Sequence, residues 1–353
     1  MAEQLKEPSI VRDKAFCEKS IEEIATESIP RISVLGIGGA GCNIASWIKE
    51  KGVFGARIYA LNSDAMQLSR IAADRKILLG YDVCRGLGCG DSPELGARVA
   101  GESSIEIASV LKGSGLSFLI AGLGRGTGTG ATPVVATIAK EMQVLTFGVV
   151  LIPFLAEGPR LAKAKKGLER LVETCDAVIV VDNNRLRKIA GNLPIIESFG
   201  LANNLIASFI RSLSEAISYP SLVNLNFADL KAIATESGVC AMGIGEGSGQ
   251  TRVEDAVHKA LDSQLLDIED IDKCQAALVN IEGGDDMTLE EFNKAGEMIV
   301  SRISPDANVS WGTGVDTSMT GFIRVTLVLA GVGSRFLLEG PASFNTLRQG
   351  FSH

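Results

Sequence analysis

The chain has 353 residues, of which 34 are Lys or Arg and 42 are Asp or Glu, so its formal net charge is −8. This length exceeds what one minimal core needs and predicts two packed domains. The acidic balance argues against a general binder of nucleic acid or of an anionic membrane surface. The chain has two histidines, His258 and His353, and its seven cysteines include no Cys-x-x-Cys pair. A zinc site or a histidine-based catalytic triad therefore has almost no residues to draw on.

The sequence shows neither a membrane-spanning segment nor a signal peptide. The longest mostly apolar run, 144–156, contains a proline and is too short to span a bilayer. The N-terminus mixes acidic and basic residues, which is unlike a signal peptide. We expect a cytoplasmic protein with reduced cysteines and no direct membrane insertion.

Residues 1–29 predict a polar N-terminal extension, after which strand-like and helical segments alternate through a domain at 30–194. Several of the strand-like segments are apolar without alternation, as in parallel strands that are buried on both faces. This alternation predicts an α/β fold with a doubly wound parallel sheet. The expected strands are 31–36, 57–62, 76–79, 117–122, 144–152 and 177–182, and the expected helices are 39–51, 94–112, 131–141 and 160–174.

A long helical pattern over 195–219 comes next, with apolar residues at steps of three and four. About 23 residues at a rise of 1.5 Å give roughly 35 Å, enough to cross a whole domain. Residues 220–333 then predict a second, smaller α/β domain, and 334–353 a short tail. Within the second domain the expected strands are 239–245, 276–281, 309–315 and 322–330, and the expected helices are 227–237, 252–264 and 288–303.

The first of two glycine-rich loops, Gly-Ile-Gly-Gly-Ala-Gly at 36–41, follows a strand and opens a helix. Glycines at such a place let backbone N–H groups approach phosphate oxygens at the positive end of the helix. The alternative is close packing of the helix on the strand. In this context we favour nucleotide binding.

The second loop, 122–130, has five glycines among nine residues and two interleaved threonines. A bare turn needs one or two glycines, whereas this many amides and hydroxyls suit a diphosphate or a triphosphate. The sequence contains no G-x-x-x-x-G-K-[ST] pattern, so this loop is not that of a P-loop NTPase.

Residues 124–130 match, at six of seven positions, the G-G-G-T-G-T-G signature that follows the fourth strand in the tubulin/FtsZ superfamily. Five further segments agree with the family pattern in family order: 60–64, 85–88, 153–158, 183–186 and 224–229. The chain therefore resembles this superfamily over about 31–333, and its prokaryotic cell-division members most closely. The resemblance implies a Rossmann-like GTPase domain, a long central helix and a second α/β domain. It also implies bound GTP or GDP, with Mg²⁺ held through the phosphates.

The resemblance further implies head-to-tail polymerisation, in which the next subunit's loop completes the catalytic site. This loop would supply Asn224, Asn226 and Asp229. Asn226 stands where the family has a carboxylate, so we expect slow hydrolysis, because an amide cannot accept a proton. The alternative is a hydrolysis-deficient scaffold or a co-polymer partner of a second paralogue. The remote alternative is a dinucleotide-dependent oxidoreductase that uses 36–41, with Asp64 on the ribose.

Residues that match the family's phosphate-binding loops form one group of expected contacts. They are Gly38, Gly39, Ala40, Gly41, Gly88, Cys89, Gly90, Asp91, Gly124, Arg125, Gly126, Thr127, Gly128, Thr129 and Gly130. Arg125 replaces a signature glycine, and Asp91 stands where small residues usually face the γ-phosphate. We expect these two side chains to pair, the alternative being that both point to solvent. If Arg125 has a positive φ, its backbone is strained.

A second group matches the family's nucleoside contacts. Glu157 would hold the ribose, Asn183 and Asn203 would bind the guanine edge, and Phe199 would lie against the base. Asn43 is a weaker candidate for a base contact, and Arg160 a candidate for the phosphate or base region. Alternatively, Phe199 belongs to the helix core, Asn203 is a solvated or capping amide, and Arg160 belongs to a solvated basic face.

Family members usually end in a short peptide that docks a membrane-anchoring division protein. Here Phe344 and Leu347 are the candidate anchors, and a frayed tail is the interpretation we favour. The expected setting is cell division, at the division site.

Overall fold

The structure is a computed structural model. It describes residues 30–53, 55–185, 191, 193–218, 221–223, 225–262 and 271–332. The expected extension at 1–29 and the tail at 334–353 lie outside the described residues.

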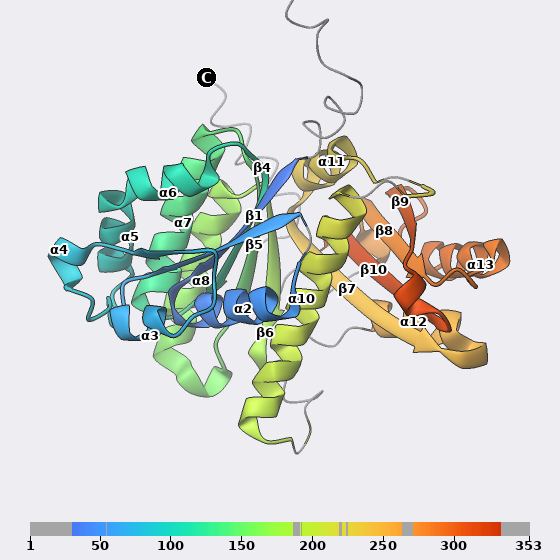
Figure 1. The fold of residues 1–353 in the computed structure, drawn as a ribbon, viewed down its shortest axis with the longest axis horizontal. Coiled ribbons are helices and arrows are strands. Elements are labelled where there is room, and N and C mark those ends of the chain that lie inside the picture. The colour runs from blue at the N-terminus through green and yellow to red at the C-terminus, as the bar shows by residue number, and fades with distance from the viewer. Residues whose placement is uncertain are drawn as a thin grey trace, which may run out of the picture.

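Ten strands form one sheet in the order β3-β2-β1-β4-β5-β6-β7-β10-β8-β9 (Figure 1). The seven strands from β3 to β7 are parallel, β10 is antiparallel to both its neighbours, and β9 is parallel to β8. The strands are β1 (Arg31–Ile37), β2 (Ala56–Asn62), β3 (Arg75–Leu78), β4 (Ser114–Gly122), β5 (Leu145–Ile152), β6 (Ala177–Asp182), β7 (Gly238–Ser248), β8 (Ala276–Gly283), β9 (Asn308–Val315) and β10 (Phe322–Ala330).

Helices cover both faces of the parallel part of the sheet, as expected for a doubly wound fold. One face carries α2 (Gly38–Lys51), α10 (Ile195–Ser218) and α11 (Phe227–Ser237). The other carries α5 (Pro93–Glu102), α6 (Ser104–Leu111), α7 (Gly126–Glu141) and α8 (Gly158–Thr174). In the second half, α12 (Arg252–Leu261) and α13 (Leu289–Val300) pack on β8 and β10. The short elements are α3 (Ala65–Ser69), α4 (Tyr81–Cys84), η2 (Leu155–Glu157), η3 (Gly249–Thr251), η4 (Ile271–Lys273) and η5 (Thr317–Met319).

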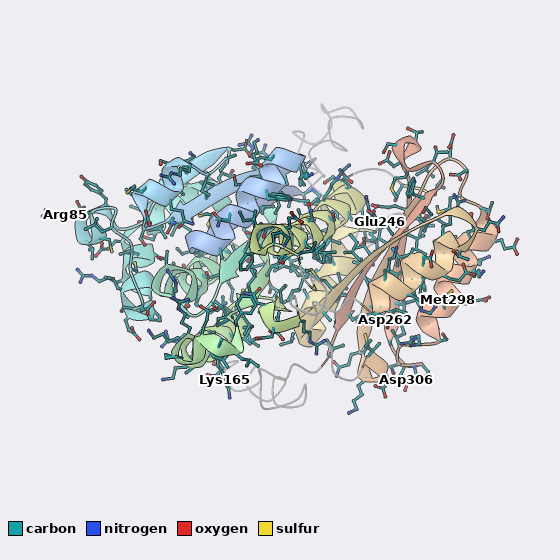
Figure 2. All side chains as sticks on the ribbon, turned by 90° about the horizontal axis from the view of Figure 1, so that it is seen from below. Arg85, Lys165, Glu246, Asp262, Met298 and Asp306 are labelled. Atoms are coloured by element: carbon teal, nitrogen blue, oxygen red, sulfur yellow. The ribbon has the colours of Figure 1, made fainter. Side chains whose placement is uncertain are left out.

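The central helix α10 joins the two halves through one shared core. Its Ile206 and Phe209 are fully buried in the cluster that also contains Phe118 of β4 and Leu278 of β8. Figure 2 shows the two halves side by side, with Lys165 on the first and Met298 on the second. Because the sheet and this core both continue from one half to the other, the expected domain boundaries stay a prediction.

The helix expected over 94–112 is wrong as a single element, because α5 and α6 are separate helices. Ser103 lies between them, and its Oγ accepts a hydrogen bond from the N–H of Gly80 at 3.1 Å. Helices α3 and α4 were not expected, since elements of five and four residues are too short to show a period. The side chain of Asp64 caps the first of them.

Candidate functional site

The two glycine-rich loops meet at the carboxyl ends of β1 and β4. Gly38 opens α2 with φ +71°, and a Cβ at this position would lie 2.8 Å from the backbone N of Gly128. No other residue fits such a conformation and such an approach without strain. The two loops that were expected to hold the phosphates therefore lie against each other.

The N-termini of α2 and α7 both lack a side-chain cap. Asp64, Ser92 and Thr288 accept backbone N–H groups at the starts of α3, α5 and α13, whereas α6, α8 and α12 also lack such a cap. What sets α2 and α7 apart is the glycine-rich loop at each N-terminus. Uncapped first-turn N–H groups at a positive helix end form an anion-binding surface. Two such ends side by side suit the consecutive phosphates of one nucleotide.

Hydroxyl groups hold the second loop in shape. Thr129 Oγ1 accepts a hydrogen bond from the N–H of Gly124 at 2.7 Å, and Thr127 Oγ1 lies 2.7 Å from Ser63 Oγ. Gly124 has φ +108°, whereas Arg125 has φ −114°. The strain considered for Arg125 is therefore absent, because the preceding glycine makes the turn.

Residues 88–91 close the site from the side of α5. The N–H of Gly126 donates to the carbonyl of Gly90 at 2.9 Å, and the buried Cys89 thiol donates to Ser63 Oγ at 3.3 Å. In the part of the chain that the structure describes, no ion pair joins Asp91 to Arg125, and both side chains are exposed. The expected pairing is wrong for this structure.

A cavity of about 660 Å³ lies between α2, α3 and the first turns of α10. Its lining includes three of the four base-contact candidates, Asn43, Phe199 and Asn203, but not Asn183. Phe199 is 39% exposed and lies edge-on to Phe154, with ring centroids 6.2 Å apart. The alternative that Phe199 belongs to the helix core is wrong, since its ring borders this cavity.

The expected ribose residue, Glu157, has protein partners in this structure. Its carboxylate forms an ion pair with Arg160 and accepts the N–H of Phe154 at 3.2 Å. The neighbouring Asn183, at the end of β6, has a buried side-chain oxygen with no hydrogen-bond partner among the described residues. Such an oxygen is costly unless a ligand donor reaches it, and guanine carries N–H donors on its edge.

The expected catalytic residues lie elsewhere. Asn226 Oδ1 accepts the N–H of Asp229 at 2.8 Å, and Asp229 Oδ2 accepts the N–H of Asn226 at 3.0 Å. This reciprocal capping box starts α11. Asn224, the third expected residue, lies outside the described residues.

Helix α11 lies at the amino ends of the parallel strands, whereas the glycine loops lie at their carboxyl ends. Phe227 of α11 approaches Gly115 at the start of β4, and the two ends of α10 mark the separation (Figure 1). The 24 residues of α10 extend over about 36 Å. Within one chain, Asp229 therefore cannot reach the phosphate loops.

Comparison with known proteins agrees with this geometry. Residues 31–191 match the GTPase domain of the tubulin/FtsZ family, and residues 238–333 match the FtsZ family C-terminal domain. The chain belongs to the tubulin/FtsZ family. Its fold, its family activity as a GTPase and its GTP or GDP ligand follow from that membership.

Two curated relatives of this tubulin/FtsZ chain show the extent of the likeness. Cell division protein FtsZ 1 of Thermococcus kodakarensis is 42% identical over 92% of the chain and 87% of the relative. Cell division protein FtsZ 2 of Methanocaldococcus jannaschii is 43% identical over 86% of the chain and 80% of the relative.

Among solved structures, an empty FtsZ dimer from M. jannaschii superposes with a TM-score of 0.82 at 40% identity, covering 88% of this chain and 91% of that one. CetZ2 from Haloferax volcanii, at 24% identity and a TM-score of 0.73 over 91% and 98% of the two chains, shares the fold.

Sequence reasoning missed several side chains that shape this FtsZ-like site. Ser63 bonds both Thr127 and Cys89, and Asn184 accepts the N–H of Leu155 at 2.8 Å. Trp47 and Gln67 line the cavity. Ser63 lies within the family segment 60–64 and Asn184 within 183–186, so position inside a family segment was the available signal.

None of the helices in the described ranges is both long and apolar enough to cross a membrane. Burial raises the pKa of the Cys42 thiol to about 12 and that of the Cys84 thiol to about 11. These raised pKa values keep both thiols protonated at neutral pH, which disfavours the nucleophilic thiolate form.

Proposed function

We propose that this FtsZ-like GTPase polymerises head to tail and hydrolyses GTP at a site shared by two successive subunits. One observation carries the proposal: the phosphate loops and the Asn226–Asp229 capping box lie at opposite ends of α10. A second copy stacked end to end brings one subunit's box over the next subunit's loops. Repetition of this heterologous contact produces a filament.

Each group of residues then has a part in the reaction. The α2 and α7 N-termini hold the phosphates, while Asn183, Phe199 and Asn203 bind the base and Glu157 the ribose. Asp229 of the next subunit orients the attacking water, and Asn226 contributes a neutral amide. Catalysis of this kind works by positioning and by electrostatic stabilisation of the transferred phosphoryl group.

Among the described residues, no three His, Cys, Asp or Glu side chains gather so that they could hold a metal ion. We propose that Mg²⁺ binds through the nucleotide's phosphate oxygens beside the Thr127 and Ser63 hydroxyls. When bound, Mg²⁺ neutralises charge on the phosphates. This donor set fits Mg²⁺, which prefers oxygen ligands and keeps several waters.

Complementation between two defective variants tests the shared site. Gly38→Ala damages the nucleotide loop, because its Cβ would approach Gly128, whereas Asp229→Asn removes the carboxylate and keeps the cap. Each variant alone should lack turnover. A one-to-one mixture should recover about a quarter of the wild-type rate, since random stacking pairs an intact pocket with an intact loop at that frequency.

Gly101→Ala is the matched control, because a Cβ there meets no atom within 4 Å. It should keep full turnover alone and in mixtures. Two variants that stay inactive when mixed, although both remain folded, would contradict the shared site.

The second candidate is a scaffold that binds GTP but needs another paralogue's loop for hydrolysis. The amide at Asn226 favours it. A filament of this kind should gain turnover when mixed with a relative that carries both carboxylates, and a pure homopolymer should remain inactive.

By analogy with the curated relatives named cell division proteins, we propose that the filament acts in the cytoplasm at the division site. A membrane-anchoring division protein and a second FtsZ paralogue are the partners we propose. The same proposal includes the division of the chain into a GTP-binding domain at 30–194, a central helix at 195–219 and a second domain at 220–333.

A further inference from the structure

Gln67 of α3 occupies a central position between the first phosphate loop and the nucleoside cavity. Its Nε2 donates to the carbonyl of Gly39 at 3.2 Å, and its Oε1 accepts from Asn62 Nδ2 at 3.0 Å. The same Nε2 lies 3.5 Å from Asn43 Oδ1. Three amide side chains thus form one hydrogen-bonded chain, from Asn62 through Gln67 to Asn43.

Backbone groups at both ends fix the direction of this amide chain. Asn62 Oδ1 accepts the backbone N–H of Asp64 at 3.3 Å, so the Asn62 amide must donate towards Gln67. The carbonyl of Gly39 can only accept, so Gln67 must present its amino group there. Both contacts require the same orientation of the Gln67 amide. A reversed amide would place donor against donor at Asn62 and oxygen against oxygen at Gly39.

The position of Gln67 is itself tightly determined. Its backbone N–H donates to Asp64 Oδ1 at 3.0 Å, which fixes the first turn of α3. A Cβ at Gly39 would lie 2.9 Å from Gln67 Oε1. The glutamine amide therefore packs directly over the Gly39 backbone, where a methyl group would displace it.

The consequence reaches Asn43, whose side chain is exposed and lines the cavity with Phe199 and Asn203. Since its Oδ1 faces the Gln67 donor, its Nδ2 remains to face the cavity. We propose that Gln67 is a positioning residue for base selection, which orients Asn43 so that its Nδ2 donates to the purine. This inference rests on the proposed GTP site.

The chemistry of the two common purines makes such a donor selective. Guanine carries the acceptor O6 where adenine carries an amino donor. A donor that the amide chain holds in place binds the guanine O6 and is repelled by the adenine amino group. A free asparagine amide could rotate and accept either base, so selectivity depends on Gln67.

Gln67→Glu in the full chain is the decisive variant. A carboxylate cannot donate, so Asn43 must turn its amino group towards Glu and its oxygen towards the cavity. The added negative charge near the phosphates weakens both nucleotides alike, so we expect the GTP-to-ATP affinity ratio to fall about tenfold, the scale of one hydrogen bond. The measurement is titration of GTP and of ATP, each with wild type and variant.

Equal weakening of GTP and ATP would overturn the proposal, because it would show that Gln67 supports the phosphate loop only. Unchanged affinities would overturn it as well. If Gln67→Glu does not fold, Gln67→Met frees the Asn43 amide and should also lower the GTP-to-ATP affinity ratio.

Two further variants complete the design. In an Asn43→Ala background, Gln67→Glu should no longer change the GTP-to-ATP ratio, because the group that it orients is gone. Gln143→Ala, at an exposed turn between α7 and β5, is the matched control and should bind as wild type does. A wild-type protein that fails to bind GTP would contradict the proposed function itself. If the wild type prefers GTP and Gln67→Glu leaves that preference unchanged, only the role of Gln67 is contradicted.

Discussion

At the residue scale, position 226 combines a structural and a chemical role. Asn226 caps α11 through its side-chain oxygen, and Asn and Asp cap helices about equally well. Asn226→Asp therefore adds a carboxylate without loss of the cap. We expect GTP turnover of the polymer to rise at least about tenfold, because general-base assistance contributes about 10²–10⁴ in rate. Phosphate release at fixed protein concentration measures it.

Asn226→Ser is the control for this prediction. A serine also accepts the N–H of Asp229 but brings neither an amide nor a carboxylate. Its turnover should stay near that of the wild type. An Asn226→Asp variant that assembles and yet hydrolyses GTP no faster would show that the amide does not limit the reaction.

At the element scale, the guanidinium of Arg252 joins α12 to α13 and to the loop that precedes α13. Arg252 is buried and donates to both oxygens of Glu291 and to Asp286. These hydrogen bonds hold the pKa of Glu291 at about 2, below its ordinary value of 4.5. A lowered carboxyl pKa contributes stability that is present above about pH 4.5 and is lost as the pH falls towards 2.

Glu291→Gln tests this contribution. The variant should have a lower free energy of unfolding at pH 7, and that free energy should depend less on pH between 4.5 and 2 than in the wild type. Denaturant unfolding at several pH values gives both quantities. Parallel pH profiles of wild type and variant would show that Glu291 does not couple to folding.

At the same scale, regular elements were predictable and local polar contacts were not. The buried parallel strands and the long period of α10 are strong signals, because burial on both faces and a 24-residue helix both leave a pattern. The break at Ser103 depends on a hydrogen bond to Gly80, distant in the sequence. No local pattern records such a contact.

In the candidate site, too, the backbone features were predictable and the side-chain contacts were not. Gly38 and Gly124 mark the loops because the backbone there requires positive φ, which glycine supplies. The partners of Thr127, Glu157 and Gln67 come from other loops, so the sequence could name these residues without saying what they contact. The prediction that Asp91 pairs with Arg125 was wrong for the same reason, because the sequence does not show where two loops place their side chains.

At the scale of the whole molecule, the direction of the parallel sheet decides where chemistry can occur. Nucleotide-binding loops gather at the carboxyl ends of β1 and β4, and α11 with Asp229 packs at the amino ends. We propose that these two regions are the halves of one catalytic site, which a single chain holds at opposite ends. In this proposal two chains in line bring the halves together, and α10 sets the spacing.

The most direct measurement is GTP turnover as a function of protein concentration, with light scattering recorded in the same samples. We predict that turnover per subunit is negligible below a critical concentration and rises together with scattering above it. Asp229→Asn should abolish the rise in turnover. Turnover per subunit that stays constant down to concentrations without polymer would contradict a site made by two chains.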